Sequence, residues 1–213
     1  MPPPYEYLRD PDAIYRRSFS LIREAVDLAG LPPGIDALAE RLIHACGMPE
    51  ILPDLAWTPD LPAAVASALA AGKPVLCDAE MVVHGVIRSR LPADTPVLCF
   101  LNDPAARAIG RRDGITRSAA AVELWQPHLD GAVVVIGNAP TALFRLLELL
   151  AADAAPRPAA ILGFPVGFVG AAESKAALIA DADGIPYATL RGRRGGSAMA
   201  AAALNALAGG TGE

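Results

Sequence analysis

Five short runs of consecutive apolar residues along the chain each predict a buried β-strand. The runs are PVLCD (74–78), VLCFL (97–101), AVVVIGN (132–138), AAILGF (159–164) and YATLR (187–191). The segments between and around them have the apolar spacing of helices, near 80–87, 104–109, 117–128, 140–151, 171–182 and 197–208. Continuous apolar strands that alternate with helices indicate a parallel sheet with both faces covered. The pattern therefore predicts an α/β fold, namely a flavodoxin-like, doubly wound domain of three α/β/α layers around a mainly parallel five-stranded sheet.

The first 72 residues predict extra N-terminal helices in front of this core. We expect helices over 11–28, 35–46 and 62–71, with an irregular proline-rich segment over 48–60. Asp10 followed by Pro11 is typical of an N-cap and a first helical position, and Gly47 is typical of a left-handed helix terminator. We expect one domain, 1–213, with an N-terminal helical part (1–72) and an α/β core (73–213).

Composition narrows the class of protein. The chain is 53% hydrophobic but only 5% aromatic, so the core must be built mainly from Ala, Val, Leu and Ile. The formal net charge of −5 argues against non-specific nucleic-acid binding, which needs a basic surface. No segment approaches the roughly 18 uninterrupted apolar residues of a membrane helix. The sequence therefore predicts neither a nucleic-acid partner nor a membrane partner.

The cysteines and the start of the chain bear on the compartment. Cys46, Cys77 and Cys99 are too few and too scattered for a disulfide framework or a CxxC metal site. The first residues, MPPPYEYLRDPDA, lack the apolar core of a signal peptide. We expect a reduced, cytoplasmic protein.

His44 is a candidate for proton transfer, and Arg41 and Ser18 are polar positions that draw attention beside it. Arg41 and His44 lie three residues apart on the polar face of the helix expected over 35–46. A cation is favoured at the carboxyl end of a helix, and imidazole is the usual acid–base group near neutral pH. A solvated surface pair is the alternative. Ser18 interrupts an apolar stripe of Ile14, Leu21 and neighbouring residues, so its hydroxyl either bonds back to the carbonyl four residues earlier or faces a ligand.

Several arginines are candidates for binding an anion. Thr116 is expected to cap a helix whose first turn contains Arg117, where the helix dipole disfavours a cation unless it serves a ligand. The turn RGRRGGS brings Arg191, Arg193 and Arg194 together beside glycines at the carboxyl end of a strand. Open α/β sheets bind ligands at that edge, and guanidinium groups recognise carboxylates or phosphates bidentately. The alternatives are an exposed charged loop and the arginine bias of a GC-rich genome.

Six segments that together span most of the chain resemble the precorrin-8X methylmutase family of cobalamin biosynthesis. They are YLRDPDAIYRRSF (7–19), ERLIHACGM (40–48), TRSAAAVELW (116–125), VIGNAPTALFRLLEL (135–149), ILGFPVGFVGAAESKAAL (161–178) and RGRRGGSAM (191–199). The resemblance implies an isomerase that moves a methyl group from C-11 to C-12 of the corrin ring. The product would be hydrogenobyrinate from precorrin-8X, or cobyrinate from the cobalt-containing substrate.

The resemblance also implies roles for individual residues. It places the catalytic histidine at His44, which would protonate the macrocycle, and it places substrate contacts at Ser18, Arg41 and Arg117. It implies no cofactor, a homodimer with active sites near the subunit interface, and handover to neighbouring corrin-pathway enzymes. Corrin precursors carry several acetate and propionate groups, so the cluster at 191–194 suits the same ligand.

Three other readings remain open from the sequence. One is a carrier that binds the corrinoid without chemistry. Another is a flavodoxin-like nucleotide or phosphate binder, although no GxxxxGK[ST] phosphate loop is present. The third is a metal site in which Glu80 and His84, four residues apart, would join His44, and no recognised ligand motif supports it.

Overall fold

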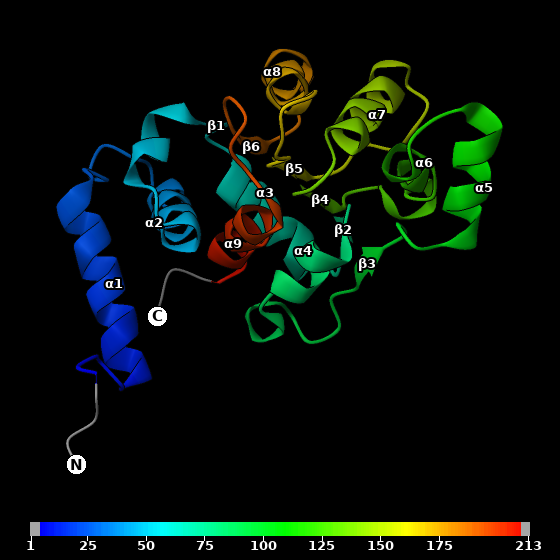
Figure 1. Cartoon of the computed structure of the whole chain (residues 1–213). Helices are drawn as coiled ribbons and strands as arrows, with labels where there is room; N and C mark the ends of the chain where they lie inside the picture. Colours follow the sequence, from blue (N-terminus) through cyan, green and yellow to red (C-terminus); the bar gives the residue numbers. More distant parts are fainter. Residues whose placement is uncertain (1–4, 210–213) are drawn as a thin grey trace.

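A six-stranded sheet lies between two layers of helices in the computed structural model, which describes residues 5–209 (Figure 1). Residues 1–4 and 210–213 of the expected domain lie outside the described residues. The strands are β1 (Leu55–Trp57), β2 (Val75–Cys77), β3 (Val97–Cys99), β4 (Val133–Ile136), β5 (Ala160–Gly163) and β6 (Tyr187–Leu190). Their order across the sheet is β1-β6-β5-β4-β2-β3, and every pairing except β1–β6 is parallel.

This order confirms the predicted fold class. Without β1, the five parallel strands lie in the order second, first, third, fourth, fifth, which is the flavodoxin-like doubly wound arrangement. The five predicted apolar runs are β2 to β6. The switch point, where the chain reverses its direction of winding, lies between β2 and β4.

The predicted number of strands was wrong by one. Leu55–Trp57, inside the segment expected to be irregular, forms β1 and pairs antiparallel with β6, with Leu55 opposite Leu190. A three-residue strand between prolines is too short to show alternation, so only pairing with β6 defines it. The rest of that segment contains a short 3₁₀-helix, η1 (Pro49–Asp54).

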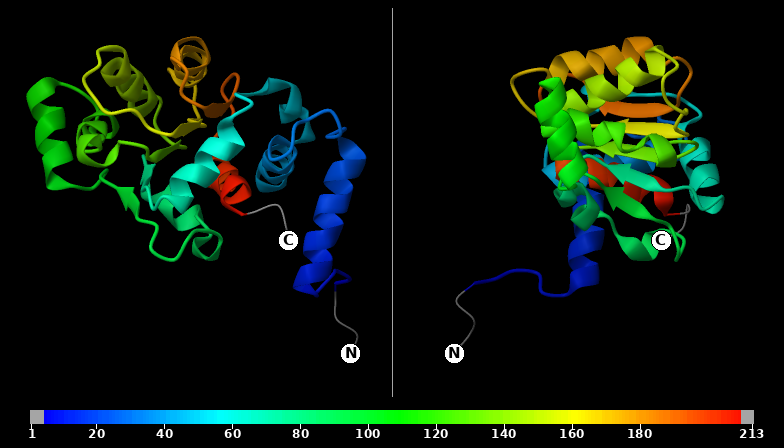
Figure 2. Two further views of the ribbon diagram at one scale, coloured as in Figure 1. Left: turned by 180° about the vertical axis from the view of Figure 1, so that it is seen from behind. Right: turned by 90° about the vertical axis from the view of Figure 1, so that its right-hand side faces the viewer.

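Alternate residues of each strand enter two separate cores, as expected of a sheet covered on both faces. Val133 and Val135 of β4 face one core, whereas Val134 and Ile136 face the other. The first core is covered by α2 (Ile35–Cys46), α3 (Leu61–Ala70), α4 (Glu80–Gly85) and α9 (Ser197–Ala208). The opposite layer consists of α6 (Arg117–Glu123), α7 (Pro140–Ala151) and α8 (Ala171–Asp181) (Figure 2).

Two helices lie at the ends of the molecule, outside these layers. Helix α1 (Pro11–Ala25) packs on α2 beyond the β1 edge, and α5 (Pro104–Asp113) packs on α6 beyond the β3 edge (Figure 1). No helix within residues 5–209 is both long enough and apolar enough to cross a membrane.

Most predicted helix boundaries hold within a few residues, and three differ. Helix α1 ends at Ala25 rather than near 28. Helix α5 continues to Asp113, because Gly114 provides the left-handed terminator at φ 67°. Helix α6 stops at Glu123, and Pro127 falls in a separate 3₁₀-helix, η3 (Gln126–His128).

Candidate active site

Helices α1 and α2 bring three of the sequence candidates together. The Asp10 side chain caps α1 by accepting a 2.6 Å hydrogen bond from the Ala13 amide, and Gly47, at φ 67°, ends α2. Between these fixed ends, Ser18 Oγ lies 2.9 Å from Nδ1 of His44. Arg41, one turn before His44, donates from Nη2 to the Tyr15 hydroxyl at 2.7 Å.

Aromatic rings hold the imidazole in place. The His44 ring stacks on Phe19 with centroids 5.0 Å apart and 29° between the planes, and the Tyr15 ring meets it edge-on at 6.1 Å. The Arg41 guanidinium lies 5.8 Å from the Phe19 centroid. Because Ser18 engages Nδ1, the other ring nitrogen, Nε2, is the one left to exchange a proton with a ligand.

Within residues 5–209, the structure shows no bond from Ser18 back to its own helix, and ligand contact by Ser18 stays a prediction. Its hydroxyl contacts His44 across the helix pair rather than its own helix backbone. The apolar stripe expected on α1 was wrong in part: Ile22 is buried, but Ile14 and Leu21 are 47% and 46% exposed, and Phe19, outside the stripe, is only 7% exposed. Sequence reasoning missed Tyr15 and Phe19. The signal was available, since Tyr15 lies three residues before Ser18 and four before Phe19, so that it shares a face of α1 with each of them.

A groove of about 810 Å³ begins beside this cluster. It shares Tyr15, Phe19 and Arg41 with the cluster and runs along α1, α2, α3 and the end of α9. Its volume lies in the range of small-molecule sites, roughly 300–1,000 Å³. Arg16, Arg23 and Arg90 also line the groove, as do the carboxylates of Asp36 and Glu40, and Arg23 pairs with Glu40 at 2.6 Å. Ser18 and His44 adjoin the groove through Tyr15, Phe19 and Arg41 rather than lining it.

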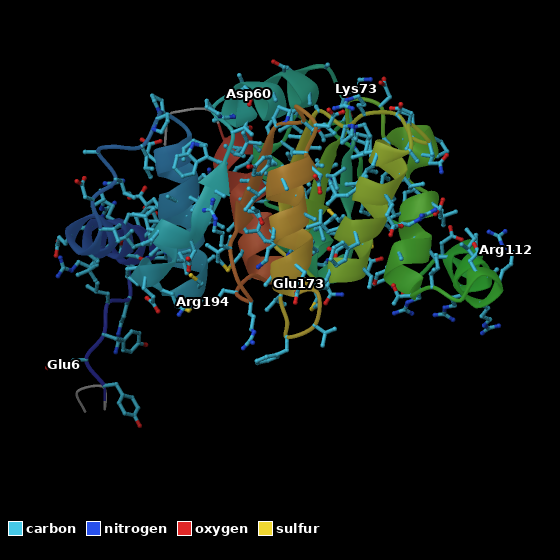
Figure 3. The ribbon with its side chains drawn as sticks, turned by 90° about the horizontal axis from the view of Figure 1, so that it is seen from above. Glu6, Asp60, Lys73, Arg112, Glu173 and Arg194 are labelled. Carbon is cyan, nitrogen blue, oxygen red and sulfur yellow. The ribbon has the colours of Figure 1, made fainter. Side chains whose placement is uncertain are left out.

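The arginine turn 191–196 follows β6 at the carboxyl edge of the sheet, where Arg194 is labelled in Figure 3. Arg194 forms an ion pair with Glu50 at 3.7 Å, and the Arg193 guanidinium lies 5.3 Å from the Phe168 ring centroid. The first contact joins the turn to η1, which follows α2, and the second joins it to the loop between β5 and α8. Within residues 5–209, none of the arginines at 191, 193 and 194 contacts His44.

A buried lysine supports the arginine turn from below. Lys175 of α8 is 0% exposed and donates from Nζ to the Arg194 carbonyl at 2.5 Å. Burial lowers the pKa of Lys175 to about 8, and the nearby Asp54 carboxylate opposes that shift. Gly195 completes the junction, because a Cβ there would lie 2.3 Å from the Phe164 carbonyl oxygen. Only glycine allows this close approach of two backbones.

The switch point between β2 and β4 is filled by the protein itself. The buried Asp78 carboxylate accepts hydrogen bonds from the amides of Gly137, Asn138 and Ala139 at 2.8, 2.9 and 2.7 Å. Burial raises the pKa of Asp78, and the three amides lower it. A phosphate would need such amides free. The structure therefore disfavours the nucleotide or phosphate reading.

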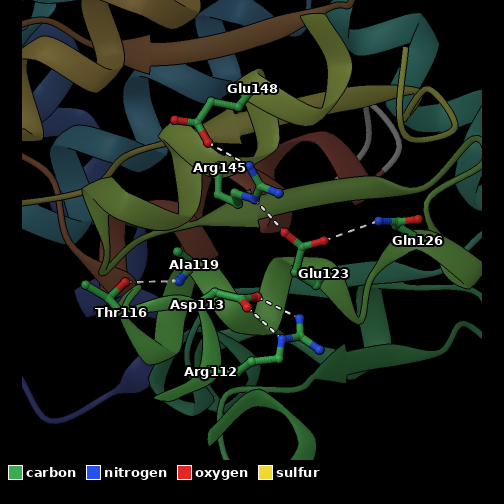
Figure 4. A network of polar contacts seen from close by, with 8 residues as sticks. All are labelled: Arg112, Asp113, Thr116, Ala119, Glu123, Gln126, Arg145 and Glu148. Atoms are coloured by element: carbon green, nitrogen blue, oxygen red, sulfur yellow. Dashed lines mark hydrogen bonds and ion pairs between the residues drawn. The ribbon is translucent and has the colours of Figure 1, made fainter. Parts of the chain in front are cut away.

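Arg117 is the one sequence candidate that the fold places far from the others. Thr116 caps α6 as predicted, by accepting from the Ala119 amide at 3.2 Å (Figure 4). Helix α6 lies at the opposite end of the sheet from α1 and α2 (Figure 1). Within one chain, Arg117 and His44 therefore do not share a site.

The structure also gives no support to the metal hypothesis, since residues 5–209 contain no cluster of three His, Cys, Asp or Glu side chains suited to an ion.

Comparison with known proteins identifies the family. The precorrin-8X methylmutase family profile matches residues 13–209. A precorrin-8X methylmutase of Pseudomonas aeruginosa is 61% identical over 203 residues, covering 95% of this chain and 97% of that protein. A cobalt-precorrin-8 methylmutase of Methanothermobacter thermautotrophicus is 36% identical over 196 residues, covering 91% of this chain and 90% of that protein.

A solved structure gives the same answer from the fold. The precorrin-8X methylmutase of Thermus thermophilus has a TM-score of 0.82 and 35% identity to this chain, with 92% of this chain and 94% of that chain covered. Profile, sequence and fold agree over nearly the whole chain. This chain therefore belongs to the precorrin-8X methylmutase family.

Proposed function

We propose that this isomerase moves a methyl group from C-11 to C-12 of precorrin-8X to give hydrogenobyrinate, with His44 as the general acid. The observation that carries the proposal is the 2.9 Å contact between Ser18 Oγ and Nδ1 of His44. It fixes the ring and leaves Nε2 to protonate the conjugated macrocycle. The product is an isomer of the substrate, so the proton returns to the imidazole once the methyl group has moved.

The surroundings of His44 suit this role. Protonation draws electron density from the ring and lowers the barrier to migration, and a positioned acid typically contributes ~10²–10⁴-fold. The Tyr15, Phe19 and Arg41 side chains hold the imidazole and present a guanidinium beside it. In the groove of about 810 Å³, apolar walls would contact the ring and guanidinium groups would pair with its acetates and propionates.

We propose the metal-free macrocycle as the natural substrate. The relative named for precorrin-8X is 61% identical to this chain, whereas the relative named for cobalt-precorrin-8 is 36% identical. A visible-absorption assay of the purified enzyme with each substrate tests the proposal. Conversion of precorrin-8X to hydrogenobyrinate supports it. Conversion of the cobalt substrate alone would reassign the substrate, and tight binding of both without turnover would identify a carrier.

We further propose that two copies of the chain complete each site. One chain places Arg117 far from His44, and α1 exposes Ile14 and Leu21, which a second copy would cover. In this arrangement, Arg117 of one copy meets substrate held by Ser18, Arg41 and His44 of the other. Arg191, Arg193 and Arg194 would bind further carboxylates.

Complementation tests the shared site. Co-expressed His44→Ala and Arg117→Ala chains should regain about a quarter of wild-type activity, because half of the dimers are mixed and one of their two sites is intact. Activity no higher than that of the two separate variants would contradict a shared site.

We also place the enzyme in the cytoplasm, which its three free thiols support, and expect it to pass product to neighbouring corrin-pathway enzymes.

A further inference from the structure

A second, smaller groove lies between α5 and α6, at the end of the molecule opposite His44. Its volume is about 270 Å³, and it is lined by Ala106, Arg107, Gly110, Arg111, Ile115 and Arg117. Arg117 is the only member that the resemblance to the family identifies. The others belong to α5 and to the turn that follows it, a stretch to which no role has been assigned.

The backbone brings three arginines to this one groove. A Cβ at Gly110 would lie 3.1 Å from the Ile115 carbonyl oxygen and 3.9 Å from Arg117 Cα, so α5 and the start of α6 are in close contact. Arg107 and Arg111 are four residues apart and therefore lie on one face of α5, on either side of Gly110 along the helix. The buried Ala106 anchors that face to the fold.

The three groove arginines differ from the other arginines nearby. Arg112 forms a bidentate pair with Asp113 at 2.6 and 2.7 Å, and Arg145 pairs with Glu123 and Glu148 (Figure 4). Across the described part of the chain, no carboxylate lies within ion-pair distance of Arg107, Arg111 or Arg117. Like charges four apart on a helix destabilise it by roughly 0.2–0.5 kcal/mol, so this arrangement favours an anion from outside.

We propose that the α5–α6 groove binds carboxylate groups of the macrocycle, with Arg107 and Arg111 as additional binding residues beside Arg117. The inference rests on the proposed function, because it takes the polycarboxylate ring as the ligand. Successive turns of α5 are about 5.4 Å apart, so Arg107 and Arg111 can meet two side chains of the same ring. In the dimer proposed above, this groove would hold the side of the ring opposite the one that faces His44.

The test compares two variants of the same helix. Arg107→Gln/Arg111→Gln removes both cations, and Arg112→Gln is the matched control, because Arg112 is also an exposed residue of α5 but is paired with Asp113 outside the groove. For the double variant, we expect KM for precorrin-8X and Kd for hydrogenobyrinate to rise about tenfold, with kcat changed less than twofold. The control should match wild type in all three. The Tm of the double variant should equal or slightly exceed that of wild type, since a repulsion is removed.

Each outcome bears on a separate claim. If wild type converts precorrin-8X and the double variant has the same KM and Kd as the control, the groove does not bind the substrate. An equal rise for both variants would reduce the effect to general electrostatics and would also overturn the inference. If wild type converts neither form of the substrate, the proposed function fails instead. The salt dependence of KM is a further test. We expect added NaCl to raise the KM of wild type more steeply than the KM of the double variant.

Discussion

The buried Lys175 gives a quantitative prediction about stability and pH. Its ammonium has one acceptor, the Arg194 carbonyl at 2.5 Å, and burial lowers its pKa from 10.5 to about 8. At pH 7 the lysine is protonated in both the folded and the unfolded chain, and burying that charge costs on the order of 3 kcal/mol of unfolding free energy. Between pH 8 and 10.5 the folded chain releases the proton while the unfolded chain keeps it. The free energy of unfolding should therefore rise with pH through that window.

Lys175→Met isolates this contribution. The variant loses the pH-dependent cost, and it leaves the Arg194 carbonyl without its partner, which costs about 1–3 kcal/mol at every pH. The difference in unfolding free energy, wild type minus variant, should increase by about 3 kcal/mol from pH 7 to pH 10.5, because other titrating groups cancel. Urea denaturation followed by circular dichroism measures this difference.

The chain offers a natural control. Its other lysine, Lys73, forms a surface ion pair with Asp130 at 2.8 Å, so Lys73→Met leaves Lys175 in place and should keep the rise in unfolding free energy between pH 8 and 10.5. With only two lysines in the chain, 13Cε labelling yields two side-chain NMR signals, and one of them should titrate near pH 8. A Lys175 signal that does not titrate near pH 8, or parallel curves for Lys175→Met and wild type, would refute the reasoning.

Two further substitutions test the site and its support. Ser18→Ala should lower kcat about five- to tenfold with little change in KM, because one hydrogen bond to the imidazole is lost. Ser18→Thr keeps the hydroxyl and should retain most of the activity. Equal kcat for Ser18→Ala and wild type would contradict the positioning role. Asp78→Asn should lower the free energy of unfolding by about 2–4 kcal/mol in urea denaturation, since an amide cannot accept from all three N–H groups after β4. An unchanged free energy would show that these contacts do not stabilise the turn.

The layered core could be predicted from the sequence because its signals are local. Apolar runs and helix caps such as Asp10, Thr116 and Gly47 are read within a few residues, and the structure confirms them. Strand β1 could not be predicted, because it depends on pairing with β6, which is more than 130 residues away. Its three residues carry too little pattern of their own.

The site could be predicted only in part, for a related reason. Ser18, Arg41 and His44 stood out as polar groups at unusual helical positions, and the structure brings them together. Tyr15 was missed because Ile14 and Leu21, rather than Phe19, were taken to lie on the buried face of α1. That error has a physical cause, since Ile14 and Leu21 are apolar but lie on the surface of a single chain. A sequence pattern does not distinguish a residue buried in the core from one that another molecule would cover.

The most direct test of the account compares wild type with His44→Ala in two measurements on the same preparations. One is the affinity for hydrogenobyrinate, and the other is the spectral conversion of precorrin-8X under single-turnover conditions. We expect His44→Ala to bind the product within about twofold of wild type and to convert the substrate ~10²–10⁴ times more slowly. A variant that binds the product normally and converts the substrate at the wild-type rate would contradict the role of His44 as the general acid.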